Sequence, residues 1–298
     1  MELPVIAETI VHPDATTRQR SEPVLTIRDL RVAYQQAEGE DIEVVHGVSL
    51  DIRKGEIHGL IGESGSGKTQ TAFAVLGLLP RGGHVSGGSI DYEGTELADA
   101  GERVYDGIRG KRIGYIPQEP MSNLDSSFTI GYQLVEPLRK NLGLSKKEAT
   151  DRSLELLARV GIPNPKRTFD AYPFEVSGGM AQRVLIAGAV STDPDLIIAD
   201  EPTTALDVTV QAEVLDLLRD LQRERHMAML LVTHNFGVVA DLCDRVTVMQ
   251  QGLFVEQGPV RTILGSPAHP YTQSLLDALL DDGPARPPFA ATAEGGRS

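Results

Sequence analysis

The chain has 298 residues, 41% of them hydrophobic and 23% charged, a composition typical of globular proteins that leaves room for one large α/β domain or two small ones. Its formal net charge is −14 and no dense cluster of Lys and Arg occurs, so we expect no nucleic-acid partner. The one cysteine, Cys243, excludes an intramolecular disulfide or a multi-cysteine metal or iron–sulfur site, and no apolar run approaches the roughly 18–20 residues that cross a bilayer.

Both ends of the sequence differ in composition from the rest. Residues 1–22 are mixed and polar, and we expect a poorly ordered arm there. Residues 282–298 are rich in proline and glycine, so we expect a disordered tail. The intervening residues 23–281 show a nearly continuous pattern of apolar and polar segments, and we expect them to fold.

Short strands separated by turns are predicted from residue 24 to residue 61. Val48, Leu50 and Ile52 alternate with polar residues, which is the period of a half-buried strand. A turn follows, and the apolar stretch Ile57–Ile61 then runs directly into glycines. The last of these strands is therefore expected to end in a glycine-rich loop.

That loop matches the phosphate-binding pattern GxxxxGK[ST] through Gly62, Glu63, Ser64, Gly65, Ser66, Gly67, Lys68 and Thr69. Its glycines let the backbone wrap closely around phosphate oxygens, and the following helix points its N-terminal N–H groups at them. Lys68 can supply positive charge to the β and γ phosphates, and Thr69 can offer its hydroxyl to Mg²⁺. We therefore predict that this loop binds ATP with Mg²⁺.

Helices are predicted between residues 130 and 190. Ser145 is placed to cap a helix whose apolar face ends at Val160, and Gly161 follows as a stop signal. A further helix begins after Gly178 and runs toward residue 191.

Two adjacent carboxylates, Asp200 and Glu201, follow the apolar strand Leu196–Ala199. Ligands bind at the C-terminal ends of the strands in open α/β sheets. Asp200 would hold the Mg²⁺ shell directly or through water, and Glu201 would orient and polarise the water that attacks the γ-phosphate. Alone, such a pair more often forms a turn or a helix cap, but after a phosphate-binding loop the catalytic interpretation is favoured.

Strands and helices alternate through the rest of the chain. Val210–Leu221 carries one apolar helical face, and Met229–Val232 and Val246–Met249 read as further strands. This alternation predicts an α/β fold with a mainly parallel sheet, with the helical stretch 130–190 inserted between core strands.

A second phosphate-facing element is predicted at residues 176–183. Ser177 and the bare amides of Gly178 and Gly179 would open a helix and form another anion site. Here the sequence resembles the ABC ATPase family, whose signature SGGxxQ is matched by these three residues and by Gln182. The leucine that usually precedes the signature is a valine here. In the family, this site faces the γ-phosphate held by another subunit.

The resemblance implies roles for further residues, in the family's order along the chain. Tyr34 would stack on adenine, with a place in the core or at a sheet edge as the alternative. Gln118 would sense both Mg²⁺ and the attacking water, and His234 would contact the γ-phosphate as a catalytic residue. Ala205–Asp207 would form a loop that crosses to the opposite subunit and brings Asp207 to the nucleotide.

The fold that the resemblance implies is an α/β P-loop NTPase of the ABC ATPase type, with a RecA-like core. An antiparallel β subdomain and an inserted helical subdomain at about 118–190 would complete it. The similarity extends over roughly residues 24–280.

Three stretches are similar to ATPase subunits of oligopeptide, dipeptide and nickel importers: residues 118–131, 199–211 and 268–279. The third belongs to a C-terminal segment at about 264–281 that most ABC ATPases lack, and we expect it to lie outside the nucleotide site. A Cys-rich segment that ends many members of this subfamily has no counterpart in the sequence, so no iron–sulfur function is carried over.

The resemblance also implies partners and a location. Two ATPase subunits, here expected to be related but non-identical chains, would clamp two ATP molecules between the loop of one and the signature of the other. Two membrane-spanning permeases and an extracytoplasmic substrate-binding protein would complete a bacterial importer of peptides. The chain would lie at the cytoplasmic face of the membrane as a peripheral subunit.

Other functions stay open at this point. The same subunit type could serve nickel or another small solute, and a soluble ABC ATPase of translation or DNA repair is a rival. A third hypothesis is a subunit that binds nucleotide without hydrolysing it, but the presence of Glu201 and His234 disfavours this.

Overall fold

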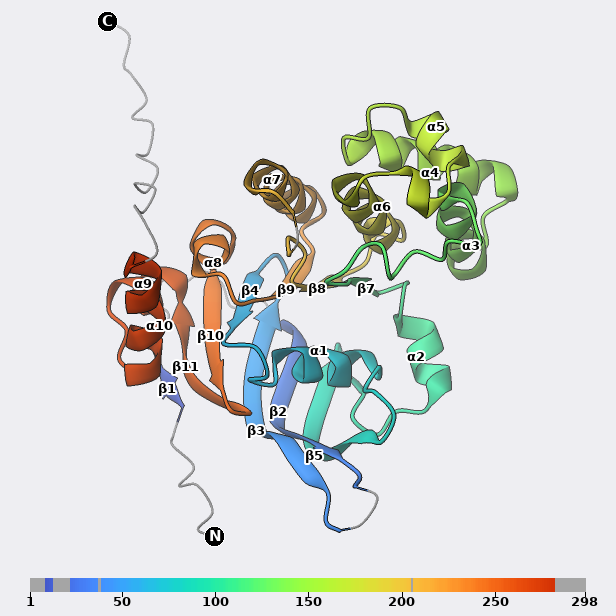
Figure 1. Ribbon diagram of the computed structural model, residues 1–298. Helices are drawn as coiled ribbons and strands as arrows, with labels where there is room; N and C mark the ends of the chain where they lie inside the picture. The colour runs from blue at the N-terminus through green and yellow to red at the C-terminus, as the bar shows by residue number, and fades with distance from the viewer. Residues whose placement is uncertain (1–8, 13–21, 37–38, 205, 282–298) are drawn as a thin grey trace, which may run out of the picture.

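Two β-sheets organise the protein, whose computed structural model describes residues 9–12, 22–36, 39–204 and 206–281 (Figure 1). One sheet has seven strands in the order β1-β11-β10-β4-β9-β8-β7, and the other has four in the order β3-β2-β5-β6. Helix α1 (Lys68–Leu76) lies between them, and the remaining large helices gather on the other side of the seven-stranded sheet (Figure 1).

One block of the seven-stranded sheet, from β10 to the edge strand β7, is parallel and mostly buried. Its strands are β4 (Ile57–Ile61), β7 (Ile113–Ile116), β8 (Leu196–Asp200), β9 (Ala228–Thr233) and β10 (Arg245–Gln250). All residues of β4, β8 and β9 are buried, as expected where helices cover both faces of a sheet. The predicted parallel α/β sheet is confirmed.

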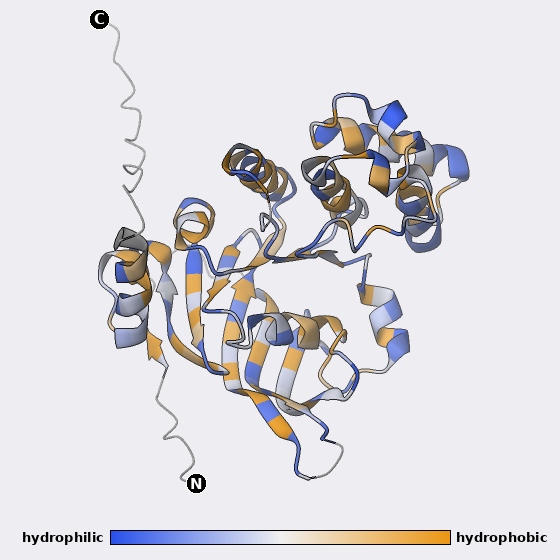
Figure 2. Ribbon diagram, in the orientation of Figure 1, coloured by the Kyte–Doolittle hydropathy of each residue, from blue (hydrophilic) through white to orange (hydrophobic). Residues whose placement is uncertain are grey.

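The four-stranded sheet is antiparallel and contains β2 (Pro23–Tyr34), β3 (Ile42–Arg53), β5 (Gly83–Tyr92) and β6 (Thr95–Glu96). Hydrophobic and hydrophilic residues alternate along its strands (Figure 2). The prediction of short strands from residue 24 to residue 61 is confirmed for Ile57–Ile61, which forms β4, but it was wrong for β2 and β3, which each run for 12 residues. Register shifts absorb the irregular pattern, and Asp29 adopts φ 47° within β2.

Two hydrophobic clusters hold these layers together. Leu25 of β2, Leu60 of β4 and Val75 of α1 belong to one buried cluster between the sheets. On the opposite face, Ile197 of β8 packs in a second cluster with residues of α6 and α7, among them Val214. Because β4 and β8 are anchored from both faces, their C-terminal ends are rigid supports for a site.

A group of helices comprises α3 (Ile130–Leu142), α4 (Lys146–Arg159), α5 (Pro165–Asp170) and α6 (Gly178–Val190). The predicted cap at Ser145 is confirmed as a capping box with Glu148. Helix α2 (Glu102–Ile108) lies apart, between β6 and β7. None of the helices in the described ranges is long and apolar enough to cross a membrane.

The C-terminal part continues with α7 (Val208–Arg225), α8 (Phe236–Leu242), β11 (Leu253–Pro259), α9 (Val260–Gly265) and α10 (Pro270–Asp281). Strand β1 (Ile10–Val11) pairs in parallel with β11. The expected poorly ordered arm is therefore wrong for residues 9–12, because these backbone groups complete the edge of the sheet. The expected tail, residues 282–298, lies outside the described residues.

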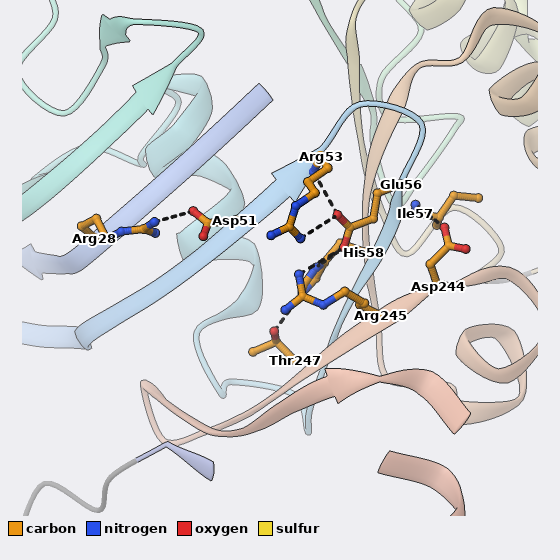
Figure 3. Close-up of polar contacts among 9 residues, drawn as sticks. All are labelled: Arg28, Asp51, Arg53, Glu56, Ile57, His58, Asp244, Arg245 and Thr247. Atoms are coloured by element: carbon orange, nitrogen blue, oxygen red, sulfur yellow. Dashed lines mark hydrogen bonds and ion pairs between the residues drawn. The ribbon is translucent and has the colours of Figure 1, made fainter. Parts of the chain in front are cut away.

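A buried polar cluster lies at the start of β4 (Figure 3). The ring of His58, which is 0% exposed, is 2.8 Å from Thr247 Oγ1 and 3.3 Å from Glu56 Oε1. Glu56 also accepts the backbone N–H of Arg53 at 3.0 Å and pairs with Arg245 at 3.4 Å. Burial raises the pKa of the Glu56 carboxyl, but His58, the Arg53 backbone N–H and Arg245 together outweigh burial and hold the pKa below its ordinary value.

Candidate functional site

The predicted site residues follow four neighbouring strands of the seven-stranded sheet. The glycine-rich loop 62–69 follows β4, Gln118 follows β7, Glu201 follows β8 and His234 follows β9. Because these strands are parallel, their C-terminal ends meet at one edge. The topology thus brings together residues that are far apart in the sequence.

Glycine is required in the loop by close backbone contacts. A Cβ on Gly62 would lie 2.1 Å from the backbone carbonyl oxygen of Met249. A Cβ on Gly67 would lie 2.6 Å from Cε in the side chain of Met249. Gly65 and Gly67 also adopt positive φ angles of 79° and 107°, which favour glycine. The loop is therefore a tight wrap against the β10–β11 hairpin.

Lys68 bonds to the start of the loop from its inner side. It is 5% exposed, and its Nζ donates to the carbonyl oxygens of Gly62 and Glu63, each at 2.8 Å. Burial lowers the pKa of Lys68, while the carboxylates of Glu201 and Asp200 act in the opposite direction. The ammonium group is thus held at the loop's centre, where phosphate oxygens would neutralise it.

Asp200 and Thr69 form the part of the site suited to a divalent cation. Thr69 Oγ1 donates to Asp200 Oδ1 at 3.4 Å, and Asp200 is only 2% exposed. Burial raises the pKa of Asp200 to about 6; the Thr69 hydrogen bond opposes this and the charge of Glu201 adds to it. Hard oxygen donors beside a buried carboxylate fit Mg²⁺, whose charge would favour the ionised form of Asp200.

Glu201 connects three other polar side chains. Its Oε2 accepts from Thr204 Oγ1 at 2.7 Å and from Gln118 Nε2 at 3.5 Å, while its Oε1 lies 2.9 Å from His234 Nδ1. Its backbone N–H donates to Val232 at 2.8 Å, and its φ is 46°. This left-handed conformation places the carboxylate directly after the strand, between the ends of β7 and β9.

The electrostatics of Glu201 favour its charged form. Burial raises the pKa of this carboxyl, but hydrogen bonds from Thr204 and His234 outweigh burial and lower the pKa below its ordinary value. The carboxylate is therefore ionised at neutral pH and can accept a hydrogen bond from water. His234, whose side chain is 59% exposed, borders the open side of this group.

The signature residues occupy a different place. Ser177 caps α6 by accepting a hydrogen bond from the backbone N–H of Met180, and Gly178 has open space where a side chain would stand. Gly179 packs against Val210. In the described ranges, no hydrogen bond or ion pair joins Ser177 to the loop 62–69 or to Glu201.

Asp207 likewise serves as a helix cap, because its side chain accepts hydrogen bonds from the backbone N–H groups of Thr209 and Val210 at the start of α7. Among the described residues, no polar contact joins Asp207 to the Lys68–Glu201 group. Ala205, in the same predicted loop, lies outside the described residues. Among the described residues, neither Ser177 nor Asp207 therefore makes a polar contact to the phosphate-binding loop of its own chain.

Two residues predicted to contact nucleotide, Tyr34 and Gln182, lie in different surroundings. Tyr34 is half-buried beside Gly83, and its hydroxyl donates to Gln70 Oε1 at 2.5 Å; adenine stacking stays a prediction. Gln182 is 1% exposed, and neither of its polar side-chain atoms has a hydrogen-bond partner among the described residues. A side chain so deeply buried is not placed to touch a nucleotide, so the expected contact does not fit this conformation.

Sequence reasoning missed two residues at the site. The hydroxyl of Thr204 donates to the carboxylate of Glu201. The one signal in the sequence for this contact is that Thr204 follows Glu201 by three positions. Tyr271 of α10 accepts the backbone N–H of Glu63 at 3.2 Å. Residues 268–279 were expected to lie outside the nucleotide site, and this hydrogen bond brings α10 against the outer side of the loop.

Comparison with known proteins places these features in one family. The family model for ABC transporters matches residues 45–204. A Brucella melitensis protein with the provisional name of peptide import ATP-binding protein is 47% identical over 264 residues, covering 87% of this chain and 78% of that protein. The oligopeptide transport ATP-binding protein OppD of Salmonella typhimurium is 44% identical over 267 residues, covering 89% and 79%.

A solved structure of an ATP-binding cassette has a similar fold. A dimeric ATP-binding cassette in a post-hydrolysis state, bound to ADP and Pi, is 28% identical and superposes with a TM-score of 0.71. The match covers 80% of this chain and 99% of that one.

Proposed function

This chain belongs to the ABC transporter family and is an ATP-binding, ATP-hydrolysing transport subunit, and we propose that it powers the import of peptides. The relatives named for peptide and oligopeptide transport support this cargo. Nickel or another small solute is the alternative left by the subfamily resemblance. The observation that carries the ATPase assignment is the arrangement around Glu201, beside the Lys68 wrap.

The proposed chemistry is attack of water on the γ-phosphorus with ADP as the leaving group. Glu201 accepts a hydrogen bond from this water and orients it, and Gln118 and His234 hold the carboxylate from two sides. Lys68 binds the β and γ phosphates through its ammonium group. Because Thr204 also donates to Oε2, Glu201 has little freedom to turn away.

Asp200 and Thr69 are the proposed Mg²⁺ ligands, with Gln118 at the edge of the same group. When bound, Mg²⁺ neutralises charge on the phosphates and orients their oxygens. Because Thr69 Oγ1 lies 3.4 Å from Asp200 Oδ1, the Asp200 carboxylate could hold the cation directly or through water.

We further propose that Ser177, Gly178 and Gly179 act on nucleotide bound by a second ATPase subunit. Ser177 makes no hydrogen bond to the loop 62–69 within the described part of the chain, which supports this proposal, as does the similarity to a dimeric cassette. Ser177→Arg should then leave this chain's own ATP affinity within about twofold while turnover in the assembled transporter falls at least about tenfold. Loss of its own ATP binding in a folded Ser177→Arg chain would contradict the two-chain site.

Two permeases, a second and related ATPase chain and an extracytoplasmic binding protein complete the proposed system, at the cytoplasmic face of the membrane. A direct test is phosphate release by the chain reconstituted with its permeases and partner ATPase. Short peptides with the cognate binding protein should stimulate release several-fold, and nickel should not. Stimulation by nickel alone, or association with ribosomes in place of permeases, would reject the peptide importer.

A further inference from the structure

The C-terminal helix α10 begins beside the phosphate-binding loop. Tyr271, in its first turn, is half-buried in a hydrophobic cluster that also contains Ile61, the last residue of β4, and Phe236 of α8. The ring is thus fixed by packing, and its hydroxyl oxygen accepts the backbone N–H of Glu63 at 3.2 Å.

Glu63 is the link between this hydroxyl and the ammonium group of the site. Its carbonyl oxygen accepts from Lys68 Nζ at 2.8 Å, while its own N–H donates to Tyr271. The neighbouring carbonyl of Gly62 accepts from the same Nζ. Tyr271 therefore holds, from outside, the peptide segment that positions Lys68 from inside.

A buried carboxylate fixes the start of α10. Glu256 of β11 is 0% exposed and accepts the backbone N–H groups of Ala268 at 2.8 Å and His269 at 3.1 Å. Its Oε1 also pairs with His12 Nε2 at 2.7 Å, which ties in the segment that carries β1. The backbone N–H of Tyr271 in turn donates to His269 Nδ1 at 3.2 Å. Hydrogen bonds to a buried charge are strong, so this anchor is rigid.

We propose that Tyr271 is a positioning residue for ATP, which acts by fixing the Glu63 peptide of the phosphate-binding loop. This inference rests on the proposed nucleotide site at Lys68. A loop that is already fixed loses less conformational entropy when phosphate binds, so its affinity for ATP is higher. The C-terminal segment thereby contributes to nucleotide binding without touching the nucleotide.

The positioning role and a purely structural role of the Tyr271 hydroxyl differ in their effect on folding stability. A structural role predicts a loss of stability in Tyr271→Phe, whereas the positioning role does not. Glu63 is an exposed residue, so water can replace the hydroxyl at its N–H when the hydroxyl is removed. Tyr271→Phe keeps the ring in its cluster and leaves no buried polar group without a partner. Folding stability should therefore change little, and the effect should fall on the loop.

The test uses the full-length chain with a fluorescent ATP analogue and Mg²⁺. Tyr271→Phe should raise the Kd about two- to tenfold, the range for loss of one neutral hydrogen bond. In the assembled transporter, KM for ATP should rise by a similar factor while kcat stays within about twofold. Melting temperature without nucleotide should stay close to that of the wild type. Tyr132→Phe, at an exposed tyrosine of α3, is the matched control and should leave Kd unchanged.

The outcomes separate this inference from the function on which it rests. Unchanged or tighter ATP binding by Tyr271→Phe, while Lys68→Ala loses binding, would overturn the role of Tyr271 alone. A fall in melting temperature with unchanged Kd would also overturn it and leave a structural contact. Normal binding by Lys68→Ala would instead reject the nucleotide site itself.

Discussion

Two buried carboxylates at opposite ends of the parallel strands differ in their charge balance. Glu56 directly precedes β4 and is 8% exposed, whereas Asp200 ends β8 and is 2% exposed; the pKa of Glu56 is lowered and that of Asp200 is raised to about 6. Burial raises both, so the difference comes from their neighbours. Glu56 has His58, Arg245 and a backbone N–H, whereas Asp200 has one hydroxyl donor and the like charge of Glu201.

The Glu56 cluster therefore has its charge balanced by its own neighbours, whereas the site around Asp200 does not. The cation nearest the second group, Lys68, also donates to two carbonyl oxygens, and it lowers the pKa of Asp200 less than burial raises it. The positive charge of Lys68 therefore does not balance the carboxylates of Asp200 and Glu201 at the C-terminal edge of the sheet. Mg²⁺ bound with ATP would supply the missing positive charge, so we attribute the shifted pKa of Asp200 to function.

The largest expected effect concerns Glu201. Glu201→Gln keeps the shape of the side chain but removes the charge that polarises water, so hydrolysis should fall about 10²–10⁴-fold with ATP binding retained. Single-turnover phosphate release and nucleotide binding should be measured on the same preparation. An unchanged rate would remove Glu201 from catalysis, and Asp200 or His234 would have to be reconsidered.

A smaller effect is expected for Lys68. Lys68→Ala removes a charged hydrogen bond to phosphate, which is worth about 1.5–3 kcal/mol, so ATP affinity should fall about 10- to 150-fold. Lys140→Ala, at an exposed lysine of α3, is a control of the same chemistry. Equal losses in both variants would show that general charge, not the loop, governs binding.

Acid should weaken the Mg²⁺-dependent part of ATP binding. Asp200, with a pKa of about 6, is ionised at pH 7.5 and mostly protonated at pH 5.5, and a protonated carboxyl is a poor Mg²⁺ ligand. Mg²⁺ titrations at the two values should differ about three- to tenfold, and titrations of ATP alone correct for its own protonation. In Asp200→Asn this difference should disappear; its persistence would place the titrating group elsewhere.

Local patterns made much of this structure predictable. The glycine-rich loop, the acidic pair after an apolar strand and the cap at Ser145 each depend on neighbours within about eight residues, so the sequence displays them directly. The parallel strand order then follows from alternation of strands and helices.

Features that depend on distant contacts could not be predicted in this way. Tyr271 and Glu63 are separated by 208 positions, and β1 pairs with β11 across a similar interval. The inward position of Gln182 follows from how α6 packs, which its signature pattern does not encode. The bulges that extend β2 arise from pairing with both neighbouring strands.

The most direct test of the comparison is the free energy of unfolding, without nucleotide, of Asp200→Asn and Glu56→Gln. The raised pKa of Asp200 means that its charge opposes folding above pH 6, and that this cost is relieved as pH falls from 6 toward 4. The lowered pKa of Glu56 means that its charge supports folding above about pH 4.5 and that this support is lost in acid.

Urea unfolding at pH 7.5 should therefore shift in opposite directions. Asp200→Asn should stabilise the chain by about 1–3 kcal/mol, and at pH 5.5 this gain should shrink. Glu56→Gln should destabilise it by about 3 kcal/mol, because the variant leaves Arg245 without its buried counter-charge. Destabilisation by both variants, to a similar extent, would contradict the account: Asp200 would then be a structural carboxylate like Glu56, and not one held ready for Mg²⁺.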